Sequence, residues 1–199
     1  LLVRRLNITA NNVTNIADEK EKSYEQIDLF TNYEEVNKNR KKEQIGAKLA
    51  KCAFQVAIEK TEEVKNGFCV GKHAIKSIDR SKVVAANKNR LQGSLDIDSQ
   101  VKALYPNEPR WDYALSYDDK IYFFEVHPAE TSEVDKVVNK VKWLKCWLKT
   151  HAPEINQLPK AEYPYTWVQS GRYAILPTAK EKKKLSISGI NTAKILSLK

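Results

Sequence analysis

The alternation of apolar and polar residues is clearest between Arg110 and His127, where it predicts two short strands joined by a turn at Asp118–Asp119. Because side chains on a strand alternate between its two faces, the second strand places Glu125 and His127 on one face. Asp112, near the start of the first strand, can reach the same region. The aromatic residues that separate these polar groups are predicted to belong mainly to the core.

The segments before and after this pair of strands have apolar residues at helical spacing. A period near 3.6 over residues 132–150 predicts a helix that Thr131 or Ser132 caps and that buries a valine- and leucine-rich side, with either Trp143 or Trp147. Residues 34–65 contain no Pro and a single Gly. They predict a long helix that faces the core from Ile45 onward and stops at Asn66–Gly67.

The remaining pattern predicts shorter elements. Strands are expected over 1–13, 68–70, 93–98, 165–169 and 173–176 and within 187–198. A short helix is expected over 99–104, and a basic helix or tail begins at Lys180. Residues 71–92 predict a basic loop with one or two helical turns. Strands interleaved with helices in this order indicate an α/β fold with a mixed central sheet flanked by helices.

The composition agrees with a globular domain. The chain has 199 residues, of which 42% are hydrophobic and 30% charged, and it contains no run of the roughly 20 apolar residues that a membrane span needs. Leu1–Val3 is too short for the apolar part of a signal peptide. Three cysteines, with no C-x-x-C spacing, favour free thiols over a disulfide framework or a zinc site. We therefore expect a cytoplasmic protein that does not contact the membrane.

The charge balance suggests a class of partner. The formal net charge is +9, and a basic surface attracts the phosphates of DNA or another nucleic acid. A solvated, lysine-rich surface is the alternative explanation. The candidates for nucleic-acid contact lie in the basic segment, at Lys76, Arg80, Lys82, Lys88 and Arg90.

Two segments near the start of the chain carry a resemblance. The first reads Arg-Arg-Leu-Asn-Ile-Thr-Ala-Asn-Asn-Val over 4–13, and the second contains Gln-Ile-Asp-Leu-Phe over 26–30. Together they resemble the C-terminal end of bacterial Y-family translesion DNA polymerases. The resemblance implies that the pentapeptide docks on the bacterial sliding clamp through Gln26, Ile27, Leu29 and Phe30. The catalytic carboxylates of that family lie outside these segments, so polymerase activity is not implied.

The alternative is that Ile27, Leu29 and Phe30 pack onto the helix that follows them. We expect two parts, a strand and flexible tether with the docking peptide over 1–44 and an α/β domain over 45–199. The final strand of a sheet cannot fold alone, so the first part is not predicted to be a domain of its own.

The order of elements after residue 45 carries a second resemblance. A helix, a basic segment, a strand with Asp112, a strand with Glu125, a helix and two further strands follow one another. This order resembles the restriction-endonuclease-like core of PD-(D/E)XK nucleases. The resemblance implies that Asp112 and Glu125 bind Mg²⁺ or Mn²⁺ beside a phosphate. His127 stands where that family has the lysine of its motif.

Several residues could complete such a site. His127 could act as a base or ligand, and Lys136 or Lys140 on the following helix could replace the missing lysine. Glu59, Glu62 or Glu63 could add a carboxylate. Structural roles are the alternative: Asp112 paired with Arg110, Glu125 a satisfied buried carboxylate, and His127 the end of a strand.

Three functions remain open at this point. The first is a metal-dependent, nuclease-like phosphodiesterase of DNA repair or defence, with Asp112, Glu125 and His127 in its site and lysine from Lys136 or Lys140. The second is a catalytically inactive domain of the same fold that binds DNA or protein. The third is a domain that only makes protein–protein contacts.

Overall fold

A tight hairpin lies at the centre of the sheet. In the computed structural model, which describes residues 36–38, 51–175 and 180–199, β4 (Tyr113–Tyr117) pairs antiparallel with β5 (Lys120–Ala129). Asp118 and Asp119 join them with φ of 53° and 58°, the left-handed pair of a type I′ turn, which Asp tolerates better than most residues. The predicted strand pair and its turn are confirmed.

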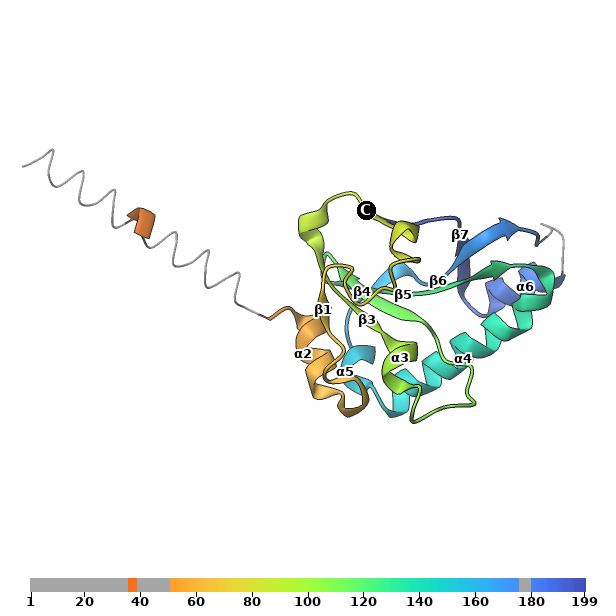
Figure 1. The fold of residues 1–199 in the computed structure, drawn as a ribbon, viewed down its shortest axis with the longest axis horizontal. Helices are drawn as coiled ribbons and strands as arrows, with labels where there is room; N and C mark the ends of the chain where they lie inside the picture. The colour runs from red at the N-terminus through yellow and green to blue at the C-terminus, as the bar shows by residue number, and fades with distance from the viewer. Residues whose placement is uncertain (1–35, 39–50, 176–179) are drawn as a thin grey trace, which may run out of the picture. The chain divides into compact units, whose positions relative to one another are not determined.

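The hairpin belongs to a six-stranded mixed sheet in the order β1-β3-β4-β5-β6-β7 (Figure 1). Its other strands are β1 (Cys69–Val70), β3 (Leu91–Asp96), β6 (Lys160–Tyr173) and β7 (Ile190–Ala193). Neighbours from β1 to β5 are antiparallel, whereas β5, β6 and β7 run parallel. The carboxyl ends of β3, β5, β6 and β7 therefore share one edge with the start of β4. The predicted α/β fold with a mixed sheet and flanking helices is confirmed.

Helices cover one face of this sheet. They are α2 (Ala53–Lys60), α4 (Val134–Thr150), α5 (Pro153–Asn156) and α6 (Lys180–Ile187). Their apolar side chains form one core with the sheet residues Ala114, Phe123 and Trp167. The predicted apolar side of α4 is buried, and Trp147 rather than Trp143 completes it, with 2% of its surface exposed.

The other face carries a different layer. Strand β2 (Val83–Ala85) pairs in parallel with β8 (Leu196–Leu198), and two 3₁₀ turns flank β2, at Arg80–Lys82 and Lys88–Arg90. Ile75, Val83, Leu196 and Leu198 from this layer pack against the sheet side chains of Tyr113, Leu115 and Phe124. The segment over 71–92 thus has its two predicted helical turns, and also a strand that was not predicted.

Several predicted boundaries were wrong. Of the predicted long helix over 34–65, residues 36–38 are helical and 39–50 lie outside the described residues. Helix α2 begins only at Ala53, after Cys52, whose backbone is extended and whose Sγ accepts the Gln55 N–H at 3.4 Å. Helix α2 then ends before an extended Thr61, and a 3₁₀ turn at Glu62–Val64 precedes Asn66–Gly67. The predicted domain boundary at residue 45 lies outside the described residues, and residues 51–199 form one compact unit.

Two further corrections concern the second half of the chain. A 3₁₀ turn at Thr131–Glu133 leads into α4, so neither Thr131 nor Ser132 caps it. The turn predicted at Ser170–Gly171 is wrong, because β6 runs through that pair to Tyr173. Of the strand predicted over 173–176, only Tyr173 belongs to β6, and residue 176 lies outside the described residues. The short helix predicted over 99–104 begins earlier, as α3 (Ile97–Val101), because the Asp96 carboxylate accepts the Ser99 N–H at 2.9 Å. Among the described helices, none has the length and apolar character needed to cross a membrane.

Candidate active site

Asp112 and Glu125 meet at the carboxyl-end edge of the sheet. The register of β4 and β5 sets Tyr113 opposite Phe124, so Asp112 lies opposite Glu125. The Asp112 N–H donates to Glu125 Oε2 at 3.0 Å, and the Val126 N–H donates to Asp112 Oδ2 at 3.0 Å. The backbone therefore fixes one oxygen of each carboxylate, and the two side chains converge as the sequence pattern suggested.

Helix α4 brings an ammonium group to the same point. Lys140 Nζ contacts Glu125 Oε1, and it lies 3.5 Å from Asp112 Oδ1. Val137, Val141 and Leu144 anchor this side of α4 in the core. Lys140 is thus held over the two carboxylates.

The second lysine candidate lies elsewhere. Lys136 is exposed, and its Nζ contacts Glu133 Oε1 at 2.9 Å. Of the two lysines proposed to replace the missing one, the structure brings Lys140 to the carboxylates and directs Lys136 to a surface ion pair.

Burial dominates the electrostatics of the site. No surface of the Glu125 side chain is exposed; this burial raises the pKa of Glu125 to about 8, with a further increase from the negative charge of Asp112, and Lys140 opposes both. Burial also raises the pKa of Asp112, although Lys140 and the Val126 N–H act against it. For Lys140, burial disfavours the ammonium, but Glu125 and Asp112 outweigh it and raise the pKa.

These shifts predict that the metal-free protein loses stability as the pH rises from about 5 to about 8. The folded state keeps a proton on Glu125 that the unfolded chain has already released, so the folded state binds more protons throughout this window. The free energy of unfolding should then fall, with a limiting slope of about 1.4 kcal/mol per pH unit for one group. Other carboxylates, at Glu59, Glu133 and Asp135, have lowered pKa values and therefore titrate below this window.

Urea unfolding at a series of pH values, in the presence of a chelator, measures this slope. Glu125→Gln removes the titrating group and should flatten the curve between about pH 5 and pH 8. An unchanged slope in the Gln variant would assign the pH dependence to other groups.

His127 lies on the same strand face but has a partner of its own. Its Nε2 is 2.6 Å from Glu133 Oε2, and Glu133 also contacts Lys136. These bonds to Lys136 and to His127 lower the pKa of Glu133. His127, Glu133 and Lys136 therefore form a second hydrogen-bonded group beside the first.

None of the glutamates proposed to add a third carboxylate joins the site. Glu63 accepts hydrogen bonds from the Tyr105 hydroxyl and Trp147 Nε1, both at 2.7 Å. Glu59 contacts Lys51, and Glu62 contacts Lys65. Within the part of the chain that the structure describes, no three His, Cys, Asp or Glu side chains are grouped to hold a metal ion.

The proposed pair between Asp112 and Arg110 is also corrected. Arg110 Nε donates instead to Asp98 Oδ1 at 2.9 Å. The Asp98 charge contributes to the raised pKa of Asp112, and Lys76, whose Nζ lies 3.8 Å from Asp98 Oδ2, lowers it. Sequence reasoning did not single out Asp98, although the alternation over 93–98 places it at the end of a predicted strand; in the structure it lies in the first turn of α3.

The basic candidates do not all lie together, although Arg80 and Lys88 line one pocket. Lys76 approaches Asp96 and Asp98 at the end of β3, whereas Arg90 pairs with Asp118 near its start. Arg80 donates to the carbonyls of Ile75 and His73, and Lys82 to that of Ser170. Lys88 is exposed and has no ion-pair partner among the described residues. The docking-peptide residues Gln26, Ile27, Leu29 and Phe30 lie outside the described residues.

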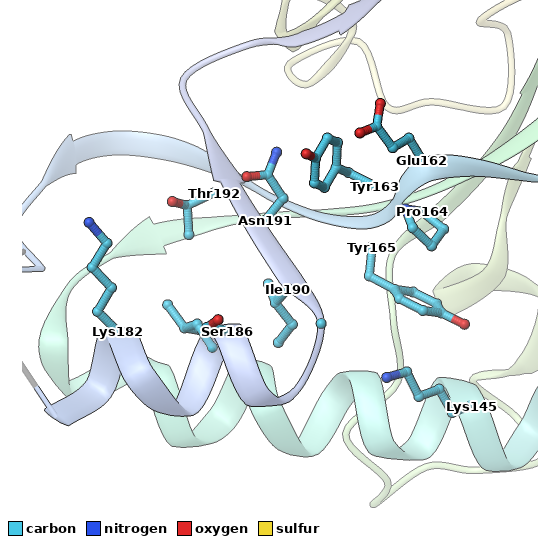
Figure 2. A pocket seen from close by; sticks show the side chains of 12 residues that line it. Lys145, Glu162, Tyr163, Pro164, Tyr165, Lys182, Ser186, Ile190, Asn191 and Thr192 are labelled. Atoms are coloured by element: carbon cyan, nitrogen blue, oxygen red, sulfur yellow. The ribbon is translucent and has the colours of Figure 1, made fainter.

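A cavity of about 490 Å³ lies between α6 and the starts of β6 and β7 (Figure 2). Glu162 and Tyr163 line it together with Lys145, whose Nζ lies 4.8 Å from the centre of the Tyr165 ring and donates to the Ser188 carbonyl at 2.8 Å. Neither Asp112 nor Glu125 lines it. The carboxylate site is therefore separate from this cavity.

Comparison with known proteins adds no relative: no protein-family model, curated protein or solved structure matches this chain.

Proposed function

We propose that residues 51–199 form a restriction-endonuclease-like domain that hydrolyses phosphodiester bonds in DNA with the help of a divalent metal ion. The observation that carries this proposal is the convergence of Asp112, Glu125 and Lys140 at one end of the sheet. Two carboxylates from neighbouring strands and a lysine are the groups that the resemblance to PD-(D/E)XK nucleases requires. The order of helix, strands, helix and strands also agrees with that core.

The carboxylates suit Mg²⁺ or Mn²⁺. Glu125 Oε2 and Asp112 Oδ2 accept backbone N–H groups, which leaves Glu125 Oε1 and Asp112 Oδ1 directed at the Lys140 ammonium. In many magnesium sites the protein supplies one or two carboxylate ligands, and oxygen atoms of water and phosphate supply the remaining ligands. Such an ion, when bound, polarises the phosphate and lowers the pKa of its water.

The protein's own groups then have defined roles. Lys140, held as an ammonium by the two carboxylates, can shift toward a phosphate oxygen and neutralise the charge that develops on it. His127 donates from Nε2 to Glu133 in one tautomer, which leaves Nδ1 free to accept a proton from the attacking water. Glu133 positions the ring for this proton transfer.

A second candidate function is a binding domain without catalysis. The observation that favours it is the same ammonium: Lys140 contacts both carboxylates and already supplies a cation between them. In that case the three groups act as a structural ion cluster, and any role in DNA binding depends on the basic residues alone.

A DNA cleavage assay distinguishes the nuclease from the non-catalytic binding domain. The substrates are supercoiled plasmid and end-labelled duplex DNA, each tested with Mg²⁺, with Mn²⁺ and with a chelator. A metal ion contributes several kcal/mol to stabilising the transition state, and each 1.4 kcal/mol is about tenfold in rate, so Asp112→Asn should lower the cleavage rate by about 100-fold or more. Asp135→Asn is the matched control, since Asp135 is an exposed aspartate paired with Lys184.

Metal-dependent cleavage that survives in Asp112→Asn would exclude this site as its source. A wild-type protein that binds DNA but cleaves neither substrate with either metal would favour the binding domain.

A further inference from the structure

The layer opposite the helices contains a pocket of about 480 Å³ that is distinct from the carboxylate site. Val83 of β2 and Leu91 of β3 lie in its wall; Val83 belongs to the core on that face of the sheet, and Leu91 packs against it. Leu91 begins β3, whereas the Ile97 N–H beyond its end bonds to the Asp112 carbonyl at 2.8 Å. The pocket and the carboxylates therefore lie at opposite ends of β3.

The walls of this pocket are basic, and no acidic residue lines it among the residues that the structure describes. The basic side chains are Lys72, His73, Arg80 and Lys88, and the aliphatic ones are Val83, Val84, Ala85 and Leu91. Acidic side chains of nearby segments are bound elsewhere, since Asp79 accepts from the Tyr113 hydroxyl and Asp118 pairs with Arg90. The positive charge of this pocket is not balanced by carboxylates that line it.

Two of these cations are fixed by backbone carbonyls. Lys72 Nζ donates to the carbonyls of Arg80 and Val83 at 3.1 and 2.9 Å. Arg80 donates to those of Ile75 and His73 at 2.8 and 3.1 Å. Both side chains are therefore held in place and still have N–H donors that can bind a ligand, because a lysine has three N–H donors and an arginine five. Lys88 has no ion-pair or side-chain hydrogen-bond partner among the described residues, so all of its donors are available.

We propose that this pocket binds a nucleoside phosphate. Fixed cations without carboxylate partners suit a phosphate group, which carries more charge than a carboxylate and accepts several hydrogen bonds. The pocket is larger than a phosphate requires, and the aliphatic wall of Val83, Val84 and Leu91 offers an apolar surface to the nucleoside. The ligand could be a free nucleotide or the 5′ end of a nucleic-acid strand, and both present the same chemistry.

Isothermal titration of the whole chain with AMP, adenosine, inorganic phosphate and a 5′-phosphorylated oligonucleotide tests this proposal. AMP should bind more tightly than adenosine or phosphate, since it alone uses both the cations and the aliphatic wall. Lys88→Glu reverses an exposed charge and should weaken AMP binding about tenfold or more at low salt. Lys149→Glu, an exposed lysine on α4, is the control and should leave the affinity unchanged.

The proposal does not depend on catalysis, because Asp112→Asn should retain AMP binding. Binding of AMP but not of the oligonucleotide would identify a free nucleotide as the ligand, and binding of both would identify a strand end. Equal affinity for AMP and adenosine, equal affinity for AMP and phosphate, or an unchanged affinity in Lys88→Glu would each overturn the proposal.

Discussion

Replacing Lys140 by alanine should lower the free energy of unfolding by about 3–5 kcal/mol above about pH 8 in metal-free solution. Glu125 is fully buried and Asp112 mostly so, and Lys140 supplies the only cation that contacts both among the described residues. Without it, two carboxylates from neighbouring strands face each other with no counter-ion. Near pH 5 the loss should be smaller, because Glu125 can then take up a proton.

Urea unfolding of the wild type and of Lys140→Ala, above about pH 8 and near pH 5, measures the difference in unfolding free energy. Lys136→Ala is the matched control. Lys136 lies one helical turn from Lys140, and its substitution removes an ion pair with Glu133 that is worth about 1 kcal/mol or less. Mn²⁺ should restore part of the stability lost in Lys140→Ala, since the carboxylate oxygens that faced the ammonium can bind the metal instead. If Lys140→Ala and Lys136→Ala lower the free energy of unfolding equally, the Lys140 ammonium does not stabilise the two carboxylates.

Sequence reasoning succeeded where structure depends on local pattern. The hairpin follows from alternation on both sides of Asp118–Asp119, and α4 follows from a helical period sustained over seventeen residues. Glu125 and His127 share a face because strand periodicity is two, which needs no knowledge of the rest of the fold. The same reasoning placed Asp112 within reach of the same region, and the register of the two strands shows that it lies opposite Glu125.

Sequence reasoning failed where a strand pairs with a segment far away in the sequence, and where several side chains compete for the same ion-pair partner. Strands β2 and β8 pair in parallel although more than a hundred residues separate Val83 from Leu196, so no local pattern predicts β2. Lys136 and Lys140 are four residues apart and lie on the same side of α4. Only the packed structure shows that Glu133, just before the helix, pairs with Lys136 and leaves Lys140 to the carboxylates.

The carboxylate site also depends on the strand beside it. Trp167 of β6 pairs in register with Glu125, has 1% of its surface exposed, and donates from Nε1 to the His127 carbonyl at 3.1 Å. Trp167 thus joins β6 to β5 at the two residues that sequence analysis selected. It is also a large part of the core beneath α4.

Trp167→Ala should therefore lower the free energy of unfolding by about 3–5 kcal/mol, the usual cost of removing a large buried aromatic side chain. Trp167→Phe keeps most of the apolar contact but leaves the His127 carbonyl without its donor, at an additional cost of about 1 kcal/mol. Trp111→Phe is the matched control, since Trp111 is equally buried and its Nε1 has no hydrogen-bond partner among the described residues. In urea unfolding, Trp167→Phe should be the more destabilising of the two Phe variants. Equal losses of unfolding free energy in the two variants would mean that the hydrogen bond to His127 adds no stability. Packing alone would then hold β6 against β5.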